Sequence, residues 1–257
     1  MAKSQSGGNG KAVFNNMNKK VEYVGKDLEA MDFAVNYHRW ILDLMKPFLG
    51  KHLVEVGAGT GAFSELLLET APETLSLVEP SAMFNNLQTN LAKHDSATKI
   101  RAFPNIFAEV ATEIETEQAP DSIIYINVLE HIEDDQLELE IIHQTLREKG
   151  RVFVFVPALP LLFSEFDKQI GHFRRYRKKQ LTEKFRAAGF RVLLSRYFDT
   201  AGIFPWLVKY RLLKSLTMES RAVHLYDKFI VPVVQPIESF LPPPIGKNLL
   251  FVGEKFN

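Results

Sequence analysis

The sequence has no cysteine among its 257 residues. This absence excludes disulfide bonds, a cysteine nucleophile and thiolate zinc sites, and it is consistent with a reducing compartment. No apolar run approaches the roughly 20 residues of a membrane span, because Pro157 and Pro160 interrupt the longest candidate, residues 152–163. The N-terminal residues lack the apolar core of a secretory signal. We therefore expect a cytoplasmic protein, with peripheral contact to a membrane as the alternative.

The sequence also has no net charge, since 31 Lys and Arg balance 31 Asp and Glu. This balance favours no particular partner and argues against nucleic acid. Charge is nevertheless uneven along the chain. Residues 109–148 hold 12 acids and one Lys or Arg, Arg147, whereas residues 168–179 hold six Lys or Arg and no acid. Either the two stretches are solvated or pair with each other or across a dimer, or the basic stretch binds an anionic substrate.

Apolar runs of strand length alternate with helical patterns along most of the chain. We expect strands at residues 52–56, 75–78, 98–103, 122–127, 151–157, 190–197 and 248–255. We expect helices at residues 27–49, 82–93, 106–114, 134–148 and 179–188, the first of them capped by Asp27. This alternation predicts an α/β fold with a doubly wound, mostly parallel sheet.

The polar N-terminus and a break in the strand pattern define the expected domain organisation. Residues 1–20 are rich in Gly, Asn and Ser and predict a flexible tail, followed by a single domain at residues 21–257. Residues 200–244 interrupt the alternation before the last strand, and we interpret them as an insertion. Besides ordinary core packing, three roles stay open for it: a substrate lid, a homodimer surface, or a helix at a membrane interface.

Three glycines, Gly57, Gly59 and Gly61, follow the first predicted strand and precede a helical pattern. This setting is typical of a nucleotide-binding loop, because glycine lets a ligand approach the backbone. Two interpretations fit the loop. Gly57, Gly59 and Ala62, with Glu79 about 20 residues further on, match the dinucleotide fingerprint G-x-G-x-x-G/A. The three glycines and Glu55 instead match the pattern E-x-G-x-G-x-G. Because Glu55 lies at the end of a buried strand, its carboxylate needs a partner.

Two further polar clusters follow predicted strands. The sequence N-V-L-E-H-I occupies residues 127–132, and D-K-Q-I-G-H-F-R-R-Y occupies residues 167–176. In a doubly wound sheet, ligands bind outside the carboxyl ends of the strands, so the Gly loop, Glu79 and the first cluster should share one crevice. In the second cluster, a histidine suits a general base and paired arginines can hold a carboxylate or phosphate.

In combination these motifs resemble those of the class I S-adenosylmethionine-dependent methyltransferases. The resemblance rests on E-x-G-x-G-x-G at residues 55–61, Glu79 after the next strand and N-V-L-E-H-I at residues 127–132. Residues 167–176 are similar to D-x-x-x-G-H-x-R-R-Y in a branch of bacterial-type enzymes often paired with the modification of glycans or lipid-linked sugars. The resemblance implies a Rossmann-like, seven-stranded sheet with the last strand antiparallel, and S-adenosylmethionine as the cofactor.

The resemblance also assigns roles to individual residues. It implies cofactor contacts from Glu55, Gly57, Ala58, Gly59, Gly61, Glu79, Pro80, Met83, Asn105, Asn127, Val128 and Leu129. It implies catalytic roles for His131, His172 and Tyr176, and substrate contacts for Asp167, Arg174 and Arg175. Related quinone-type enzymes have an additional acid at position 127, which is Asn in this sequence, so we expect no metal.

The expected reaction is methyl transfer to the oxygen or nitrogen of a small-molecule acceptor or a lipid- or sugar-linked acceptor. Two other functions stay open. One is an NAD(P)-dependent oxidoreductase that uses the same Gly loop. The other is an RNA methyltransferase that uses the basic stretch at residues 168–179, although we expect no nucleic-acid partner.

Overall fold

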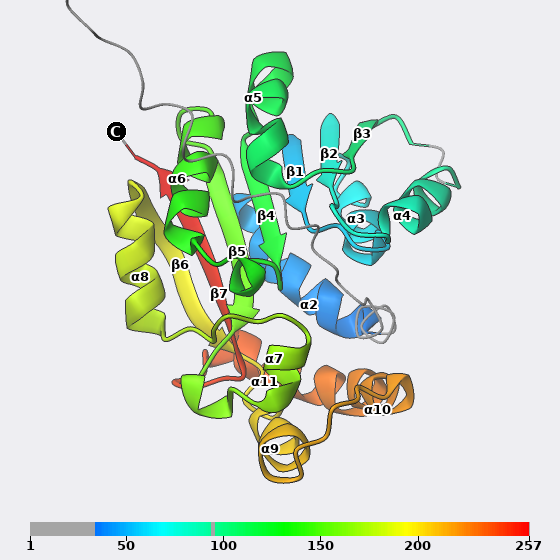
Figure 1. Ribbon diagram of the computed structural model, residues 1–257, viewed down its shortest axis with the longest axis vertical. Helices are drawn as coiled ribbons and strands as arrows, with labels where there is room; N and C mark the ends of the chain where they lie inside the picture. Colours follow the sequence, from blue (N-terminus) through cyan, green and yellow to red (C-terminus); the bar gives the residue numbers. More distant parts are fainter. Residues whose placement is uncertain (1–33, 94–95, 257) are drawn as a thin grey trace, which may run out of the picture.

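A seven-stranded sheet forms the centre of the protein, with the strand order β3-β2-β1-β4-β5-β7-β6 (Figure 1). The computed structural model describes residues 34–93 and 96–256. The strands are β1 His52–Val56, β2 Thr74–Val78, β3 Lys99–Phe103, β4 Ser122–Ile126, β5 Arg151–Pro157, β6 Phe190–Phe198 and β7 Asn248–Lys255. β7 runs antiparallel to β5 and β6, whereas the other paired strands are parallel. The predicted Rossmann-like sheet is therefore confirmed.

Helices cover both faces of this sheet (Figure 1). The α-helices are α2 Val35–Met45, α3 Ala62–Leu68, α4 Phe84–Leu91, α5 Phe107–Gln118, α6 Asp135–Thr145, α7 Glu165–Gln169, α8 Lys178–Ala187, α9 Ile203–Trp206, α10 Ser220–Leu225 and α11 Val231–Phe240. Shorter 3₁₀-helices are η2 Lys46–Phe48, η3 Leu129–His131 and η4 Pro160–Leu162, and the π-helices are η5 Leu207–Leu212 and η6 Tyr226–Ile230.

Two apolar clusters hold the layers together, one on each face of the sheet. Successive side chains of a strand point to opposite faces, so Leu53 and Val54 of β1 belong to different clusters. One cluster joins the sheet to α5, α6 and α8, and the other joins it to α2 and α3. Because both faces are covered, the central strands are apolar along their length, as in β5, where residues 152–157 are all buried.

The observed strand boundaries agree with the predicted ones to within one residue. Helix boundaries differ more. α5 continues to Gln118 rather than ending near residue 114, because its last turn is polar and gives no apolar periodicity to detect. The first described helix begins at Val35, and the predicted cap Asp27 and the predicted tail at residues 1–20 lie outside the described residues.

The segment predicted as an insertion, residues 200–244, is mostly helical. α9 and η5 form one continuous stretch, and α10, η6 and α11 form a second, beyond the carboxyl ends of the parallel strands (Figure 1). Asp227 in η6 accepts hydrogen bonds from the backbone N–H groups of Asn36 and Tyr37, at 3.1 and 2.8 Å. The segment is thus attached to the start of α2. Across residues 34–93 and 96–256, no helix is long and apolar enough to cross a bilayer.

Candidate functional site

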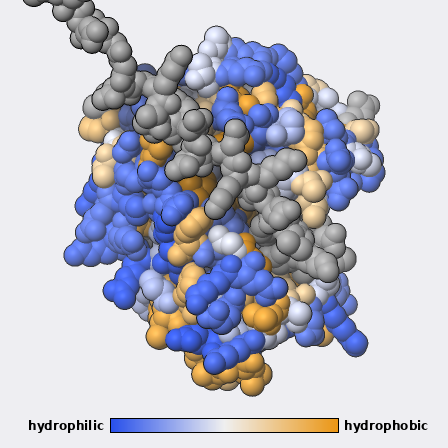
Figure 2. Space-filling view, viewed as in Figure 1, coloured by the Kyte–Doolittle hydropathy of each residue, from blue (hydrophilic) through white to orange (hydrophobic). Residues whose placement is uncertain are grey.

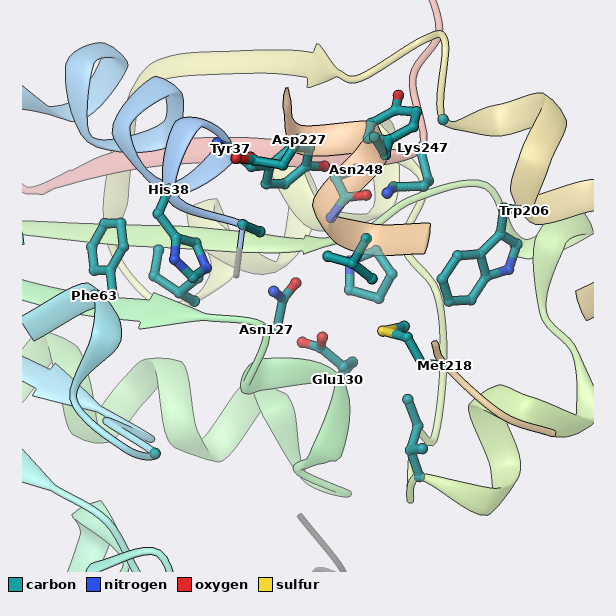
Figure 3. A pocket seen from close by; sticks show the side chains of 18 of the residues that line it. Tyr37, His38, Phe63, Asn127, Glu130, Trp206, Met218, Asp227, Lys247 and Asn248 are labelled. Atoms are coloured by element: carbon teal, nitrogen blue, oxygen red, sulfur yellow. Dashed lines mark hydrogen bonds between the residues drawn. The ribbon is translucent and has the colours of Figure 1, made fainter. Parts of the chain in front are cut away.

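A cavity of about 300 Å³ lies at the carboxyl ends of the parallel strands, at the neighbouring strands β1 and β4, where the strand order of the sheet reverses. This is the place where sheets of this kind bind ligands, and the volume is at the lower end for small-molecule sites. Residues 57–59 of the Gly loop line one part. Figure 3 shows Asn127 and Glu130 in the middle of the cavity, with Trp206 and Met218 beyond them.

Backbone conformation explains the three glycines after β1. The φ angle is +72° at Gly57, +57° at Gly59 and +96° at Gly61, a left-handed region that residues with a Cβ rarely adopt. A Cβ on Gly57 would also lie 2.3 Å from Cγ2 of Val128, in the loop after β4. The glycines therefore let the two loops approach each other at the edge of the cavity.

Glu55, near the end of β1, is a buried carboxyl group on the cavity wall. Its Oε2 accepts a hydrogen bond from the Ser64 hydroxyl at 2.5 Å. Burial raises the pKa of Glu55 to about 8, and the Ser64 hydrogen bond opposes this rise. The partner that this buried carboxyl requires is therefore a side chain of α3, which the sequence analysis did not identify. The carboxyl group is therefore neutral at pH 7.

Glu79 follows β2, as predicted, and binds the Gly loop directly. Its Oε2 accepts a hydrogen bond from the Gly59 N–H at 2.7 Å, and its Oε1 accepts one from the Ser81 N–H at 2.8 Å. These two bonds account for the burial of a carboxylate that is only 4% exposed. Glu79 thus fixes the middle of the Gly loop from outside the cavity.

The loop after β4 places Asn127 and Glu130 on the cavity (Figure 3). Asn127 has a left-handed φ of +54°, which Asn tolerates better than most residues with a side chain. Glu130 in η3 is fully buried, and neither of its oxygens accepts a hydrogen bond from the part of the chain that the structure describes. Burial raises the pKa of Glu130 to about 7, although His172 and Arg175 favour its charged form. A buried carboxyl without a partner is costly, so Glu130 can serve a ligand.

His172 lines the cavity and is held in one orientation by Asp167. Its Nδ1 lies 3.0 Å from Asp167 Oδ1, and its Nε2 lies 3.8 Å from Glu130 Oε1. Burial alone would raise the pKa of Asp167, but the hydrogen bond from His172 and the charge of Arg175 hold it below its usual value. An ionised carboxylate only accepts hydrogen bonds. Nδ1 therefore carries the proton of the neutral ring, and Nε2 is left as a proton acceptor.

His131 also lines the cavity, with its ring centroid 4.6 Å from that of His172. Burial and the neighbouring His172 lower the pKa of His131 to about 3, which makes it a weak base at neutral pH. Glu130, His131 and His172 each bring one ligand atom to within 4.8 Å of the others, a spacing that could accommodate a metal ion. The expectation of no metal stays a prediction.

Arg174 and Tyr176 fix their loop to α6 instead of facing the cavity. The Arg174 guanidinium pairs with Asp135 Oδ2 at 2.9 Å, and the Tyr176 hydroxyl donates to the same oxygen at 2.8 Å. Burial and the charge of Asp135 raise the pKa of the Tyr176 hydroxyl. The structure thus shows structural contacts for both residues, and the substrate contact of Arg174 and the catalytic role of Tyr176 stay predictions.

Arg175, in contrast, lies on the cavity wall. Its guanidinium pairs with Asp167 at 2.8 Å and lies 4.4 Å from the centre of the Trp206 ring. Asp167 is fully buried and does not line the cavity, and it orients Arg175 and His172; its predicted contact with a substrate stays a prediction. Ser164 donates a further hydrogen bond to Asp167 at 2.7 Å. The predicted loop therefore supplies two cavity side chains and the residue that positions them.

The other predicted cofactor residues do not line the cavity. They are Gly61, Pro80, Met83, Asn105, Val128 and Leu129. Pro80, Met83 and Asn105 follow β2 and β3, close to Glu79 in the sheet order. The Asn105 amide donates to Glu109 of α5 at 3.1 Å.

Sequence reasoning missed a large part of the cavity wall. These residues include Tyr37, His38, Phe63, Trp206, Tyr210, Met218, Lys247 and Asn248 (Figure 3). They come from α2, α3, the insertion and the start of β7, so no local motif unites them. Burial lowers the pKa of His38 to about 4, so this histidine is neutral. The aromatic residues of the insertion were the one available signal in the sequence.

Comparison with known proteins connects this geometry to a family. A family model described as a methyltransferase domain matches residues 25–195, well over half of the chain. The comparison with curated protein sequences gives no significant match.

Solved structures share the fold at low sequence identity. An S-adenosylmethionine-dependent methyltransferase from Archaeoglobus fulgidus aligns with a TM-score of 0.56 and 15% identity, over 89% of this chain and 99% of that chain. The N-methyltransferase NodS from Bradyrhizobium japonicum, in complex with S-adenosylhomocysteine, has a TM-score of 0.58 and 12% identity, over 91% and 98%. The 1,6-didemethyltoxoflavin-N1-methyltransferase from Burkholderia thailandensis, with S-adenosylhomocysteine bound, has a TM-score of 0.56 and 17% identity, over 91% and 83%.

Proposed function

The chain belongs to the methyltransferase-domain family, and from this premise we propose that it transfers a methyl group from S-adenosylmethionine to a hydroxyl or amine of a small-molecule or lipid-linked acceptor. Family membership decides against the nicotinamide-dependent oxidoreductase that the Gly loop alone left open. The observation that carries the proposal is the oriented pair of His172 and Asp167, whose free nitrogen opens into the same cavity as the Gly loop.

The residues around the Gly loop fit this cofactor. The left-handed glycines allow close approach to the backbone, and Glu55 and Asn127 line the cavity beside them. Glu79 after β2 supplies a carboxylate of the kind that accepts ribose hydroxyls in folds of this type. When bound, the cofactor supplies an activated methyl group on a sulfonium. What remains for the protein is to position an acceptor and remove its proton.

His172 is suited to the removal of that proton. Because Nδ1 donates to Asp167, Nε2 is the basic nitrogen, and it faces the space beside Glu130. An acceptor hydroxyl or amine that is hydrogen-bonded to the Glu130 carboxyl would lie beside Nε2 of His172, which would then take a proton from the acceptor. General base catalysis of this kind contributes roughly 10²- to 10⁴-fold.

The cavity wall supports an acceptor with an apolar or planar part. Trp206, Tyr210 and Met218 form the side of the cavity supplied by the insertion, and the Arg175 guanidinium lies against the Trp206 ring. Aromatic walls with a few polar groups are typical of small-molecule sites. This composition favours an amphiphilic acceptor, such as a lipid-linked one, over a highly charged one.

The alternative of an RNA acceptor has less support. Four of the six cations of the basic stretch at residues 168–179 form ion pairs within the protein. Lys168 pairs with Glu165, Arg174 with Asp135, Arg175 with Asp167 and Lys179 with Glu183. Phosphate binding needs cations that are available at the surface. These ion pairs support the interpretation of residues 168–179 as a paired stretch over the interpretation as a binding surface for an anionic partner.

Calorimetry tests the cofactor assignment and labelling tests the acceptor class. Titration with S-adenosylhomocysteine should give binding that Glu79→Ala weakens, whereas the matched change Glu73→Ala, at an exposed acid before β2, should not. Binding of NADH alone would refute the proposal. Incubation with methyl-labelled cofactor should then label a compound in a small-molecule or lipid extract but not in purified RNA.

A further inference from the structure

The outer face of the insertion exposes an unusual amount of apolar surface. Twelve of the 17 large apolar side chains that the described residues expose lie within residues 204–245. Among them, Phe240 is 92% exposed, Leu213 73% and Phe204 71%. Figure 2 shows apolar residues along the lower edge of the molecule, where Figure 1 places α9. Contiguous apolar surface of this kind marks an interaction site.

The exposed residues of α10, η6 and α11 form a stripe. Leu225, Phe229, Val233, Ile237 and Phe240 are all exposed and follow each other at intervals of three or four residues, so they lie on one side of a continuous helical stretch. The stripe is roughly 20 Å long. The opposite side of the stretch packs inward, where Val231 belongs to the core cluster of α2.

Basic side chains accompany this stripe. Arg211, Lys214, Arg221 and Lys228 are exposed and form no ion pair within residues 34–93 and 96–256, and the Lys228 ammonium lies 5.5 Å from the centre of the Phe229 ring. Long basic side chains beside an exposed apolar helix face are characteristic of helices that lie in a membrane interface.

The acids of the same segment do not offset these cations. Glu219 pairs with Lys209 at 3.3 Å. Asp227 is buried and accepts backbone N–H groups of α2, and Glu238 is buried and accepts the N–H groups of Asp199 and Thr200. Within residues 200–244, the exposed charge that forms no ion pair is therefore positive. Outside that segment, Lys168 and, with it, Lys214 and Arg211 lower the pKa of the exposed Glu165 of α7.

We infer that the outer face of α9 to α11, with η5 and η6, docks on an anionic lipid bilayer. The stripe would enter the boundary between headgroups and acyl chains, and Arg211, Lys214, Arg221 and Lys228 would meet anionic headgroups. A second copy of the chain is the less suitable partner. In a two-fold dimer the same patch faces itself, so the unpaired cations of one copy would approach those of the other.

Docking places the cavity next to the bilayer. The inner side of the same helices supplies Trp206 and Val223 to the cavity wall, and the loop between η5 and α10 supplies Met218. A helix with its side chains is about 10 Å across. A lipid-linked acceptor could thus reach Glu130 and His172 from the bilayer. This last step rests on the proposed methyl transfer, whereas the docking does not.

Vesicle flotation tests the docking. The full chain is mixed with vesicles of phosphatidylcholine alone, or of phosphatidylcholine with phosphatidylglycerol. We expect binding to the anionic vesicles that falls as salt is raised. Each basic residue near such a surface contributes about 1 kcal/mol, or about fivefold in binding. The change Arg221→Gln with Lys228→Gln should therefore weaken binding by about 25-fold, and Phe229→Ser with Ile237→Ser should abolish it.

Matched changes elsewhere serve as controls. Lys179→Gln on α8 removes an exposed cation, and Leu137→Ser on α6 removes an exposed apolar side chain. Neither should alter vesicle binding. All variants should retain S-adenosylhomocysteine affinity, which shows that they fold. If the wild-type protein binds anionic vesicles but does not bind S-adenosylhomocysteine, the proposed function is refuted and the docking is not.

Three results would overturn the inference. Wild-type protein that does not float with anionic vesicles would do so, and so would patch variants that float as well as the controls. The third is a wild-type dimer in sedimentation velocity that Phe229→Ser with Ile237→Ser dissociates, without any vesicle binding. That outcome would assign the face to contact between copies.

Discussion

His172 is the residue whose surroundings most clearly suit proton transfer. Its Nδ1 is fixed by the Asp167 carboxylate, and its Nε2 lies 3.8 Å from Oε1 of Glu130, a carboxyl that accepts no hydrogen bond from the described residues. His131, the other predicted base, has a pKa of about 3 because it is buried and lies next to His172. The structure therefore separates two histidines that the sequence left equivalent.

His172→Asn should lower turnover by roughly 10²- to 10⁴-fold, because it removes the general base. Affinity for S-adenosylhomocysteine should not change, since His172 makes no contact with the Gly loop. Steady-state rates and calorimetry provide the two readouts. Arg177→Ala, at an exposed position of the same loop, is the matched control. An equal loss of rate and of affinity in His172→Asn would show that the loop is structural.

Asp167 acts through His172, so its effect should not add to that of His172. In Asp167→Asn, the amide can donate to Nδ1 and favour the tautomer with a proton on Nε2, which removes the base. The double variant should then be no slower than His172→Asn alone, as is usual for groups that act as a unit. Multiplicative losses would mean that the two residues work independently.

Glu55 makes the stability of the protein depend on pH. Its pKa is about 8 in the folded protein against 4.5 without burial. Between these values the folded state holds a proton that the unfolded chain has released, so stability falls as pH rises, by about 1.4 kcal/mol per unit. Glu55→Gln keeps a partner for Ser64 and should flatten this decline in thermal unfolding across that range. Glu65→Gln, exposed on α3, should leave the decline intact, and parallel slopes in all three proteins would contradict the assignment.

At the scale of elements, the insertion stabilises the start of α2. Asp227 caps that helix from 190 residues away in sequence, by accepting the N–H groups of Asn36 and Tyr37. Asp227→Ala should therefore lower the free energy of unfolding by up to about 2 kcal/mol in urea titrations. Asp134→Ala, which removes a local cap on α6 with a single bond to Leu137, should cost about 1 kcal/mol. If Asp227→Ala costs less than Asp134→Ala, α2 does not depend on the insertion.

The sheet was predictable because its strands are short apolar runs with clear breaks. In β4 and β5 nearly every residue is buried, so burial on both faces appears directly in the sequence. The helices of the insertion were not predictable as elements. Their exposed stripe from Leu225 to Phe240 removes the contrast between an apolar and a polar face on which helix prediction relies.

The parts of the candidate site that could be predicted are those in which a motif occupies one short, continuous loop. The Gly loop is explained by left-handed φ angles, and Glu79 lies at the end of β2 as expected. The basic loop was only partly predictable. Arg174 and Arg175 are adjacent in sequence, yet Arg174 pairs with Asp135, whereas Arg175 pairs with Asp167 and lines the cavity. Which way each side chain turns depends on partners more distant in sequence.

At the scale of the whole molecule, one edge of the sheet gathers all the groups that the proposed reaction needs. Within it, Glu130, His131 and His172 also have a spacing that could hold a metal ion. We expect methyl transfer to proceed without one, because proton removal by His172 requires Nε2 to be free. A chelator should therefore leave turnover unchanged. Loss of activity with the chelator, and its recovery with a divalent cation, would contradict this expectation.

The same edge relates the helices of the insertion to the acceptor. Their inner side lines the cavity with Trp206 and Val223, and their outer side carries the apolar stripe and exposed cations that form no ion pair within the described residues. If the acceptor comes from a lipid bilayer, the outer side of these helices would bind the bilayer and their inner side would receive the acceptor. Labelling in the lipid fraction and in the aqueous fraction of the same extract distinguishes this source from a soluble acceptor.

The most direct measurement follows a labelled methyl group from S-adenosylmethionine into an extract of lipids and small molecules, with wild-type protein and with His172→Asn in parallel. We predict one labelled product with the wild type and almost none with the variant, while both bind S-adenosylhomocysteine equally. Equal labelling by the two proteins would contradict the role of His172. No labelled product from a wild type that binds the cofactor would contradict methyl transfer to an acceptor of this class.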